Sequence, residues 1–369
     1  MDQVRQYLLR RHGGPAVLAL SRGPSPSAGP GEVGVRVSAI GVNYAEILSR
    51  KGLYGWAPKL PYVPGMEAAG IIDAVGPGVT GRAVGESVVV GTQFGCYAER
   101  VVVPAVRALP AVPGYSPAEN AAFAVNYATA WVALMEMARL RPTDRVLVTA
   151  AAGGVGTAAV QLAAAFGCDV TGAVGSEAKR ARLAPLGARQ AILYEDLPSK
   201  ANQLDVVLEL VGGPVYRDAL ASLAPFGRLV VAGFASLDLQ RWNPWSWWRT
   251  WRDIPRATIG DLALASRGVL ATHLGYLLDD PPRLLDVWRD LTAFVERHGI
   301  RPVIGATVPF ERMADAHRLI ESRRCVGKVV VSPVSSEQAA AARESQQPGR
   351  AAPPHAYRLL LTVHCSLSR

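Results

Sequence analysis

One stretch near the middle of the chain constrains the fold most. DRVLVTAAAGGVGTAAVQLAAAFG reads as a β-branched strand, a turn with Gly153, Gly154 and Gly156, and an alanine-rich helix over residues 155–166. Such a turn lets backbone N–H groups approach a pyrophosphate at the positive end of the helix dipole. No charged residue follows until Asp169, so the span is long enough to resemble a membrane helix. The β-branched run followed by glycines instead favours a buried strand, a turn and a buried helix. We interpret the turn as the phosphate-binding part of a dinucleotide site.

Strands and helices alternate after this turn. The strand-like runs CDVTGAV, AILYE, DVVLELVG and RLVVAGF are separated by expected helices over residues 176–186 and after Pro214. This alternation predicts a parallel sheet with crossover helices. Earlier in the chain, VGVRVSAIGV, AAGIIDAVG, ESVVVG and AERVVV stand between Gly and Pro turns and predict a compact, barrel-like β unit. A chain of 369 residues is therefore expected to form two domains.

Two longer helices are also predicted. SPAENAAFAVNYATAWVALMEMARL begins with a Ser-Pro start and has Glu119 three residues after Ser116, as in a capping box. PRLLDVWRDLTAFVERHG places six apolar residues on one helical face: Leu284, Val287, Trp288, Leu291, Phe294 and Val295. The strand-like VIGATVPF, a helix over ERMADAHRLIESRR and the strand GKVVVSP follow. The polar, Pro- and Ala-rich residues after 333 predict a disordered tail.

Composition argues for a folded protein without a nucleic-acid partner. Half of the residues are hydrophobic and 19% are charged, which is typical of globular chains. The net charge is +9, but only five of the 39 cationic residues are lysine and the arginines are scattered along the chain. We therefore attribute the charge mostly to a compositional bias towards Arg, Ala and Gly. The four cysteines, Cys96, Cys168, Cys325 and Cys365, form no C-x-x-C pair, and the N-terminus lacks a signal-peptide pattern. We expect a reducing, cytoplasmic location.

The end of the second strand indicates which dinucleotide binds. An NAD site normally has an acid about twenty residues after the glycines, where it would bind the ribose hydroxyls. Here Gly175 and Ser176 stand at the strand end, and Lys179 and Arg180 follow. A small hydroxyl and two cations suit a 2′-phosphate. The alternative for the two cations is an ordinary solvated helix face. We predict NADPH as the cofactor.

With these features the chain resembles the medium-chain dehydrogenase/reductase superfamily, specifically the zinc-free, zeta-crystallin-like quinone oxidoreductases. The resemblance rests on GVNYAEILSRKGLYG, LPYVPGMEAAGIIDAVGPGV, NYATA, AAAGGVGTAAVQLA, GSEAKR and GKVVV, in order between about residues 4 and 333. Within that group, PGMEAAG, VNYATA and ATHLGYL are most similar to the vesicle-amine-transport-protein branch. The resemblance implies an α/β fold, with a doubly wound Rossmann sheet domain inserted in a GroES-like β-barrel domain. The implied ranges are 1–125 and 266–333 for the catalytic domain, 126–265 for the NADP-binding domain and 334–369 for the tail.

The resemblance also implies site residues and an assembly. It puts Tyr194 beside the adenosine phosphate, Thr129 near the nicotinamide amide, and Asn43 and Tyr44 along the reaction cleft. The expected cofactor contacts are Asn126, Thr129, Gly153, Gly154, Val155, Gly156, Ser176, Lys179, Arg180, Tyr194, Val211, Gly233, Phe234 and Lys328. Reductases of this kind are commonly dimers, so we expect a homodimer.

Metal catalysis is not expected. Zinc-dependent members of the superfamily have Gly-His-Glu where this chain has Gly65, Met66 and Glu67, and methionine is a poor ligand for catalytic zinc. None of the six histidines lies within four residues of another. Without a Lewis acid, simple alcohol oxidation is disfavoured. Glu46 also replaces the aspartate expected in the family pattern, which leaves its role open.

A quinone or conjugated ketone needs no metal, because it carries its own electron sink. The protein must position it against the cofactor, exclude water and donate hydrogen bonds to the developing oxyanion. Asn43, Tyr44 and Tyr54 are the candidate donors, and structural roles in a turn or in packing are the alternative. We predict an NADPH-dependent quinone or enone reductase. The alternatives are an enoyl reductase of a polyketide or fatty-acid pathway, and an NADPH-binding protein of little turnover with membrane or protein contacts.

The segment RWNPWSWWRTWRDIPR, from residue 241, holds five of the eight tryptophans and four arginines. Such a mixture could contact nucleic acid, a membrane surface or an apolar substrate. It follows the strand RLVVAGF, so the resemblance puts it beside the reaction cleft. Our hypothesis is a lid or wall of the substrate site in which Trp245 and Trp248 face the substrate. Interdomain packing and membrane-surface contact are the alternatives.

Overall fold

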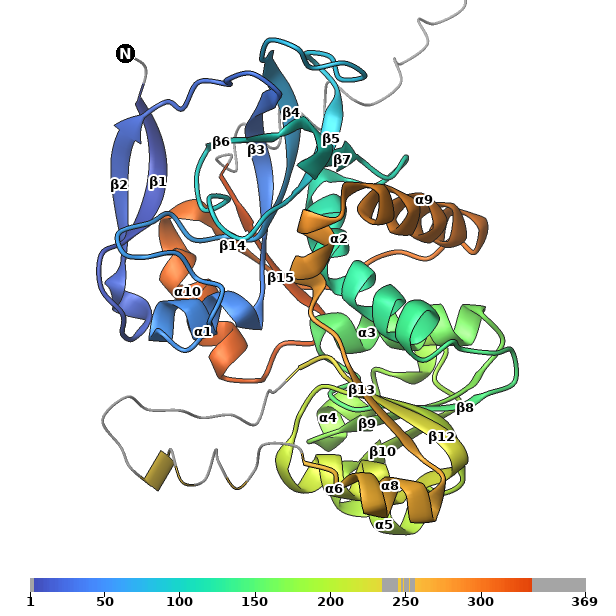
Figure 1. Cartoon of the computed structure of the whole chain (residues 1–369). Coiled ribbons are helices and arrows are strands. Elements are labelled where there is room, and N and C mark those ends of the chain that lie inside the picture. Colours follow the sequence, from blue (N-terminus) through green and yellow to red (C-terminus); the bar gives the residue numbers. More distant parts are fainter. Residues whose placement is uncertain (1–2, 234–244, 247, 249–251, 253–255, 334–369) are drawn as a thin grey trace, which may run out of the picture. The chain divides into compact units, whose positions relative to one another are not determined.

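The computed structural model describes residues 3–233, 245, 246, 248, 252 and 256–333. Two large sheets organise this part of the chain, one mainly antiparallel with seven strands and one parallel with six (Figure 1). The predicted α/β fold class is confirmed. A separate antiparallel hairpin is formed by β1 (Gln3–Leu9) and β2 (Leu18–Pro24).

The six-stranded sheet has the order β10-β9-β8-β11-β12-β13, and all neighbouring strands are parallel. Its strands are β8 (Arg145–Val148), β9 (Asp169–Val174), β10 (Gln190–Leu193), β11 (Leu204–Glu209), β12 (Leu223–Val231) and β13 (Gly268–Ala271). The helices between them are α3 (Gly154–Ala165), α4 (Glu177–Arg180), α5 (Leu197–Lys200), α6 (Gly213–Ala221) and α8 (Ile259–Ala265). Because β8 pairs with both β9 and β11, the strand order reverses at β8. Doubly wound sheets bind their ligands at such a point.

The helix predicted over residues 176–186 is wrong in extent. α4 stops at Arg180, and a turn leads into a short 3-10 helix, η4 (Ala184–Leu186). Pro185 has no N–H to continue an α-helix and disfavours the α conformation of the residue before it. Gly187, at φ 99°, then ends the segment. Lys179 and Arg180 therefore lie on a single helical turn.

The seven-stranded sheet combines both ends of the described chain. Its order is β14-β15-β3-β4-β5-β7, with β6 paired to β3. Its strands are β3 (Glu32–Val42), β4 (Glu67–Val75), β5 (Ser87–Gly91), β6 (Arg100–Pro104), β7 (Ala108–Pro110), β14 (Ile304–Pro309) and β15 (Lys328–Ser332). In the antiparallel pair β15 and β3, Val330 lies opposite Gly41. The parallel-sheet domain is thus an insertion in this one.

The remaining helical segments connect or cover the sheets. The α-helices are α1 (Tyr44–Lys51), α2 (Pro117–Trp131), α9 (Pro281–Arg297) and α10 (Met313–Glu321). A π-helical turn, η3 (Val132–Met137), extends α2. The short 3-10 segments are η1 (Pro15–Val17), η2 (Ala105–Arg107), η5 (Tyr194–Asp196), η6 (Leu274–Asp279) and η7 (Phe310–Arg312).

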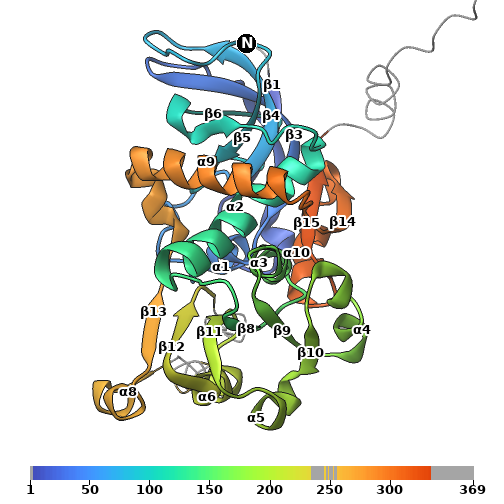
Figure 2. The ribbon, with the colours of Figure 1, turned by 90° about the vertical axis from the view of Figure 1, so that its right-hand side faces the viewer.

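Helix α2 joins the two sheets. Ser116 and Glu119 form the predicted capping box, with Pro117 in the first turn. The helix packs on β3, β4 and β15 on one side and on α3 on the other. It also lies beside α9 (Figures 1 and 2). Its many alanines allow these close approaches, and most of the helix is buried.

The apolar face predicted for α9 is confirmed. Leu284, Val287, Trp288, Leu291 and Val295 are buried, and Phe294 is partly buried against the same core. The indole N–H of Trp288 donates to the carbonyl of Pro110, 3.1 Å away. This contact ties α9 to the end of β7.

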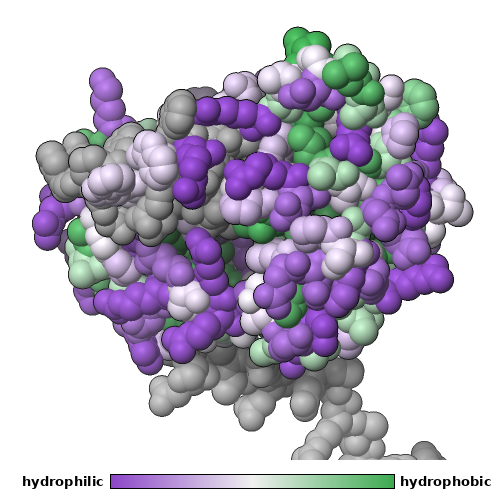
Figure 3. Space-filling view, turned by 90° about the horizontal axis from the view of Figure 1, so that it is seen from below, coloured by the Kyte–Doolittle hydropathy of each residue, from purple (hydrophilic) through white to green (hydrophobic). Residues whose placement is uncertain are grey.

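Hydrophilic residues cover most of the face seen from below in Figure 3, and hydrophobic residues form smaller groups between them. Large aliphatic side chains of the parallel sheet, such as Leu147, Val207 and Leu229, are fully buried. The apolar residues of this domain therefore lie mainly against the two faces of its sheet.

The limits of the sheets lie near, but not at, the expected domain limits. α2 spans the expected limit at residue 125, and β13 extends the six-stranded sheet to residue 271, beyond residue 265. The expected disordered tail lies outside the described residues, as does most of the tryptophan-rich segment. Among the described helices, none combines the length and the apolar character needed to cross a membrane.

Candidate active site

A cavity of about 1280 Å³ lies between the domains, lined by residues of both, of α2 and of the segment after β13. Most of the expected site residues line it: Asn43, Tyr44, Tyr54, Asn126, Thr129, Gly153, Gly154, Val155, Gly156, Ser176, Lys179, Tyr194, Val211, Gly233 and Lys328. Residues far apart in the sequence therefore converge on one site.

The glycine turn connects β8 to α3, as predicted. Gly153 is the N-cap of α3 and its N–H donates to the carbonyl of Ala150 at 2.8 Å. A Cβ added at Gly156 would lie 2.2 Å from that same carbonyl oxygen, and one at Gly154 would lie 2.5 Å from the Asn126 amide nitrogen. Only glycine allows the helix start to pack this closely on the strand end. The first turn of α3 is left facing the cavity, a cradle that fits a pyrophosphate.

A buried carboxylate holds the backbone at the end of β11, the strand beside β8. Glu209, at the end of β11, accepts hydrogen bonds from the N–H groups of Val211 and Gly212 at 2.8 and 2.9 Å. The Thr149 hydroxyl oxygen accepts from the N–H of Leu210 at 2.8 Å. Burial raises the pKa of Glu209. Sequence reasoning missed both Thr149 and Glu209, although an acid within the apolar run DVVLELVG was a visible signal.

The far end of the cavity is cationic. Ser176, Lys179 and Tyr194 line it, and β9 ends without a carboxylate. Burial lowers the pKa of Lys179. Arg180 is not among the lining residues, and its guanidinium pairs with Glu177 at 2.8 Å.

Three arginines that sequence reasoning missed also line the cavity: Arg182, Arg323 and Arg324. The last two lie between α10 and β15, more than 140 residues after Lys179. No local motif connects them to the dinucleotide turn, so only the folded chain brings them to it.

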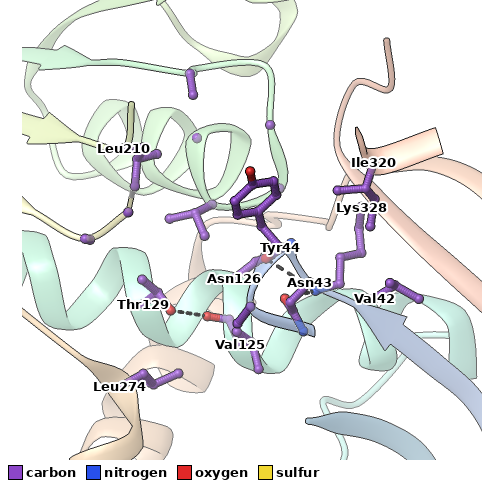
Figure 4. Close-up of a pocket in the computed structure, with 18 of the residues that line it drawn as sticks. Val42, Asn43, Tyr44, Val125, Asn126, Thr129, Leu210, Leu274, Ile320 and Lys328 are labelled. Carbon is purple, nitrogen blue, oxygen red and sulfur yellow. Dashed lines mark hydrogen bonds between the residues drawn. The ribbon is translucent and has the colours of Figure 1, made fainter. Parts of the chain in front are cut away.

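A buried polar cluster forms the base of the cavity at the antiparallel sheet. The Lys328 ammonium contacts the carboxylate of Glu67 and donates to the side-chain amide oxygens of Asn43 at 2.5 Å and Asn126 at 3.3 Å. The other Glu67 oxygen accepts from the backbone N–H of Val125 at 2.7 Å. Lys328 and Glu67 are 2% and 0% exposed. The buried ion pair thus joins β15 to β4, and the hydrogen bonds of Lys328 add the start of α1 and helix α2. Figure 4 shows Lys328 beside Asn43 and Asn126.

Glu46 lies directly behind this cluster. Its carboxylate accepts from the N–H of Asn43 at 2.6 Å and from the N–H of Met66 at 2.9 Å. Burial raises its pKa to about 7, the Lys328 ammonium opposes this rise and the Glu67 carboxylate adds to it. Glu46 therefore caps α1 and holds the loop that carries Met66, which accounts for an acid at this position.

Two more predicted residues have clear local roles. Thr129 donates its hydroxyl proton to the carbonyl of Val125, 2.6 Å away, one turn earlier in α2. The ring of Tyr44, at the start of α1, projects into the pocket between Leu210 and Lys328 (Figure 4). Tyr44 and Thr129 thus line the section between the glycine turn and the buried ion pair.

Tyr54 reaches the cavity from the loop between α1 and β4. Its hydroxyl oxygen lies 3.0 Å from Nε2 of His273, which also lines the cavity. Burial raises the pKa of Tyr54 to about 12 and lowers that of His273. The phenol is therefore protonated at neutral pH.

The structure describes two of the five tryptophans in the tryptophan-rich segment. Trp245 and Trp248 are 73% and 51% exposed, pack edge to face at 6.3 Å and are not among the cavity-lining residues. Trp248 also lies under the guanidinium of Arg252. The other three tryptophans of the segment and Phe234 lie outside the described residues. The substrate role of the two rings stays a prediction.

The residues at the zinc position of the superfamily do not form a metal-ligand set. Met66 lies there, and no group of three or more His, Cys, Asp or Glu with metal-binding geometry occurs among the described residues. Cys96 is buried nearby, and burial raises the pKa of its thiol well above the usual value. The Lys328 ammonium supplies the positive charge within this cluster.

Comparisons with known proteins agree with this architecture. Residues 29–114 match the alcohol dehydrogenase GroES-like domain, and residues 186–331 match the zinc-binding dehydrogenase family. The fold and the site thus define a two-domain dehydrogenase with a GroES-like domain and a Rossmann-like domain. The chain belongs to the medium-chain dehydrogenase/reductase superfamily and is quinone oxidoreductase-like.

Similar proteins cover nearly the whole described chain. The synaptic vesicle membrane protein VAT-1 homolog of Rattus norvegicus is 35% identical over 340 residues, which are 89% of this chain and 84% of the relative. The quinone oxidoreductase of Thermus thermophilus, solved also with NADPH, is 35% identical, has a TM-score of 0.73 and covers 89% of this chain and 99% of its own. That of Pseudomonas syringae pv. Tomato is 30% identical, with a TM-score of 0.80 and coverages of 89% and 100%.

Proposed function

We propose that the protein is an NADPH-dependent reductase of quinones or α,β-unsaturated carbonyl compounds. The observation that carries the proposal is the single cavity surface that joins a glycine cradle, a cationic end and a set of hydrogen-bond donors. When bound, NADPH supplies a hydride. The chain supplies binding, orientation and a proton, which suffice for a substrate with its own electron sink.

The cofactor would be held at three places. The first turn of α3 would hold the pyrophosphate, with Gly156 and Gly154 allowing its close approach. Ser176, Lys179 and Arg182 would hold the 2′-phosphate, because no Asp or Glu is among the described residues that line the cavity. The quinone oxidoreductase of Thermus thermophilus, which was solved in complex with NADPH, supports this choice.

The other end of the cavity would take the substrate. Tyr44 and Tyr54 would donate to its oxygen, and the buried pair of Lys328 and Glu67 would hold the Asn43 amide in place. The described walls here include the apolar residues Leu48, Met66 and Leu274, which suit a planar, apolar ring.

Binding and turnover test the proposal in sequence. NADPH and NADH affinities are measured by calorimetry, and NADPH oxidation is then followed with a panel of quinones, enones and thioester-linked enoyl substrates. Preferred NADPH binding and sustained turnover with quinones or enones are expected. Turnover confined to enoyl thioesters would favour a pathway enoyl reductase instead.

A second function has one observation in its favour, the 35% identity to a protein named a synaptic vesicle membrane protein. It would be an NADPH-binding protein with membrane or protein contacts and little turnover. Tight NADPH binding without oxidation by any substrate, together with sedimentation on anionic lipid vesicles, would support it. The predicted homodimer is tested by sedimentation velocity on the same preparation.

A further inference from the structure

His273 lies in a hydrogen-bond arrangement that determines which of its nitrogens carries the proton. It stands between β13 and η6, and the backbone N–H of Gly275 donates to its Nδ1 at 3.2 Å. A nitrogen that accepts this bond cannot itself be protonated. The neutral ring therefore carries its proton on Nε2, and burial, which lowers the pKa of His273, favours that neutral ring.

The tautomer fixes the direction of the next bond. Nε2 lies 3.0 Å from the Tyr54 hydroxyl oxygen, so the imidazole donates and the phenol accepts. The hydroxyl proton of Tyr54 must then point elsewhere. Tyr54 and His273 both line the cavity, and no other hydrogen bond of the Tyr54 hydroxyl occurs within the described part of the chain. The proton is directed into the cavity.

Packing holds the imidazole in this orientation. Trp56 stacks on its face with ring centroids 4.6 Å apart and an interplanar angle of 22°, and Tyr276 meets Trp56 edge-on at 4.8 Å. A Cβ at Gly275 would lie 2.7 Å from Cε1 of His273 and 2.5 Å from the Gln93 side chain. Glycine at 275 thus lets the backbone N–H approach the ring from one side, while Trp56 covers its face.

We propose that His273 is a positioning residue for the proton donor of the reaction: its Nε2–H bond to Tyr54 aims the phenol proton at the substrate and stabilises the phenolate that is left. This role rests on the proposed reductase function. Hydride addition to a conjugated carbon moves the carbonyl electron pair onto oxygen. That oxygen takes the Tyr54 proton, and the phenolate regains a proton from water as the product leaves. The substrate thereby gains one hydride and one proton.

Nitrogen-15 NMR of labelled histidines tests the arrangement without turnover. In the wild-type protein with NADPH, the His273 signals, assigned by comparison with His273→Leu, are expected to show the Nε2–H tautomer. An Nδ1–H tautomer would make Tyr54 the donor to His273 and would overturn the proposal.

Steady-state kinetics test the role itself. Tyr54→Phe should lower kcat about a hundredfold, the contribution usual for general acid catalysis. His273→Leu should lower kcat about tenfold, the loss expected for one hydrogen bond to a charged group, while leaving the NADPH dissociation constant unchanged. In the Tyr54→Phe background His273→Leu should have no further effect. His273→Gln, which keeps an N–H donor at a similar distance from the backbone, should restore most of the activity.

Each contrary outcome has a distinct meaning. If the losses of the two single variants multiply in the double variant, or if Gln and Leu at 273 behave alike, His273 only packs and its proposed role is wrong. Trp56→Leu, which removes the stacking partner but keeps the donor, is the packing control and should have less effect than His273→Leu. If the wild-type protein turns over no quinone or enone, the reductase function fails and the His273 role falls with it.

Discussion

Single residues at the cationic end of the cavity carry the proposed preference for NADPH. Lys179 and Arg182 line the cavity, and Ser176 stands where an acid would bind the ribose of NAD. Arg180, the neighbour predicted to share this role, instead pairs with Glu177. Because Lys179 and Arg182 line the cavity and Arg180 does not, substitutions at these three positions test the proposed preference for NADPH.

Lys179→Ala and Arg182→Ala should each weaken NADPH binding about tenfold to a hundredfold and leave NADH binding nearly unchanged, because each removes a charge-assisted bond worth about 1.5 to 3 kcal/mol. Calorimetric titration with both cofactors is the measurement. Arg180→Ala tests the sequence-based assignment directly, and Arg189→Ala, on an exposed pair with Asp169, is the control. Equal losses for NADPH and NADH would contradict the 2′-phosphate site.

Glu46 makes stability depend on pH. Its folded pKa of about 7 lies above the ordinary 4.5, so the folded protein binds this proton more tightly than the unfolded chain. The stability that the bound proton contributes is full below about pH 4.5 and is lost as the pH rises towards 7, on the order of 3 kcal/mol in all.

Urea unfolding of the wild-type protein and of Glu46→Gln between pH 5 and 8 measures this loss. The variant cannot ionise at this position, so its free energy of unfolding should fall less with rising pH than that of the wild type. Parallel pH curves for the two proteins would show that Glu46 stays ionised throughout. The comparison of slopes is unaffected by any constant cost of the substitution itself.

At the scale of elements, the contact between β8 and the start of α3 sets the shape of the glycine cradle. The strand end and the first helical turn approach so closely that a methyl group at 156 would overlap the Ala150 carbonyl oxygen. At the neighbouring end of β11, the buried Glu209 carboxylate and the Thr149 hydroxyl oxygen accept hydrogen bonds from the backbone N–H groups that follow the strand. Backbone groups from two strand ends are thereby held in place before any ligand binds.

Gly156→Ala should lower the free energy of unfolding by about 2 kcal/mol and weaken NADPH binding at least about tenfold, because the helix start must move away from the strand. Urea unfolding and calorimetry measure the two effects. Gly14→Ala is the control, since Gly14 has φ −69° and nothing within 4 Å of an added Cβ. A stable Gly156→Ala protein with undiminished NADPH affinity would refute the cradle.

At the scale of the whole molecule, both ends of the described chain build one domain. β15 pairs with β3, and the Lys328 ion pair with Glu67 joins the same two parts of the sequence. A second pair across this junction links Arg50 of α1 to Glu321 of α10 at 2.7 Å, with Arg50 only 1% exposed. These contacts join the two parts of the chain that form the barrel-like domain, before and after the inserted Rossmann-like domain.

Glu321→Ala should lower the free energy of unfolding by about 3 kcal/mol, because it leaves the buried Arg50 charge without its carboxylate. The Nε and Nη1 atoms of Arg50 have no hydrogen-bond partner among the described residues, so little remains to compensate. Asp286→Ala is the control, since its pair with Arg289 is exposed and should contribute at most about 1 kcal/mol. Equal effects of the two substitutions in thermal and urea unfolding would contradict this reading.

Much of the architecture was readable from the sequence, because it depends on local patterns. The strand, glycines and helix of residues 145–165 predicted the glycine turn, since glycines between a buried strand and a helix allow close backbone approach. The alternation of strands and helices predicted the parallel sheet, and the face of α9 was predicted residue by residue. Local pattern failed where a turn before Pro185 shortened the helix expected over residues 176–186.

Only the tertiary structure decided how distant residues meet. Arg323 and Arg324 carry no motif, and the run ATHLGYL around His273 does not show which side chain it meets, yet crossing chain segments bring all three to the cavity that the glycine turn opens. The pairing of Lys328 with Glu67 spans 261 residues, and neither position is marked by its neighbours in the sequence as half of a buried ion pair. Propensity and periodicity act over a few residues, so the sequence alone determined the elements and the turn. Partner, charge state and proton direction depend on burial and on contacts across the fold, which only the folded chain creates.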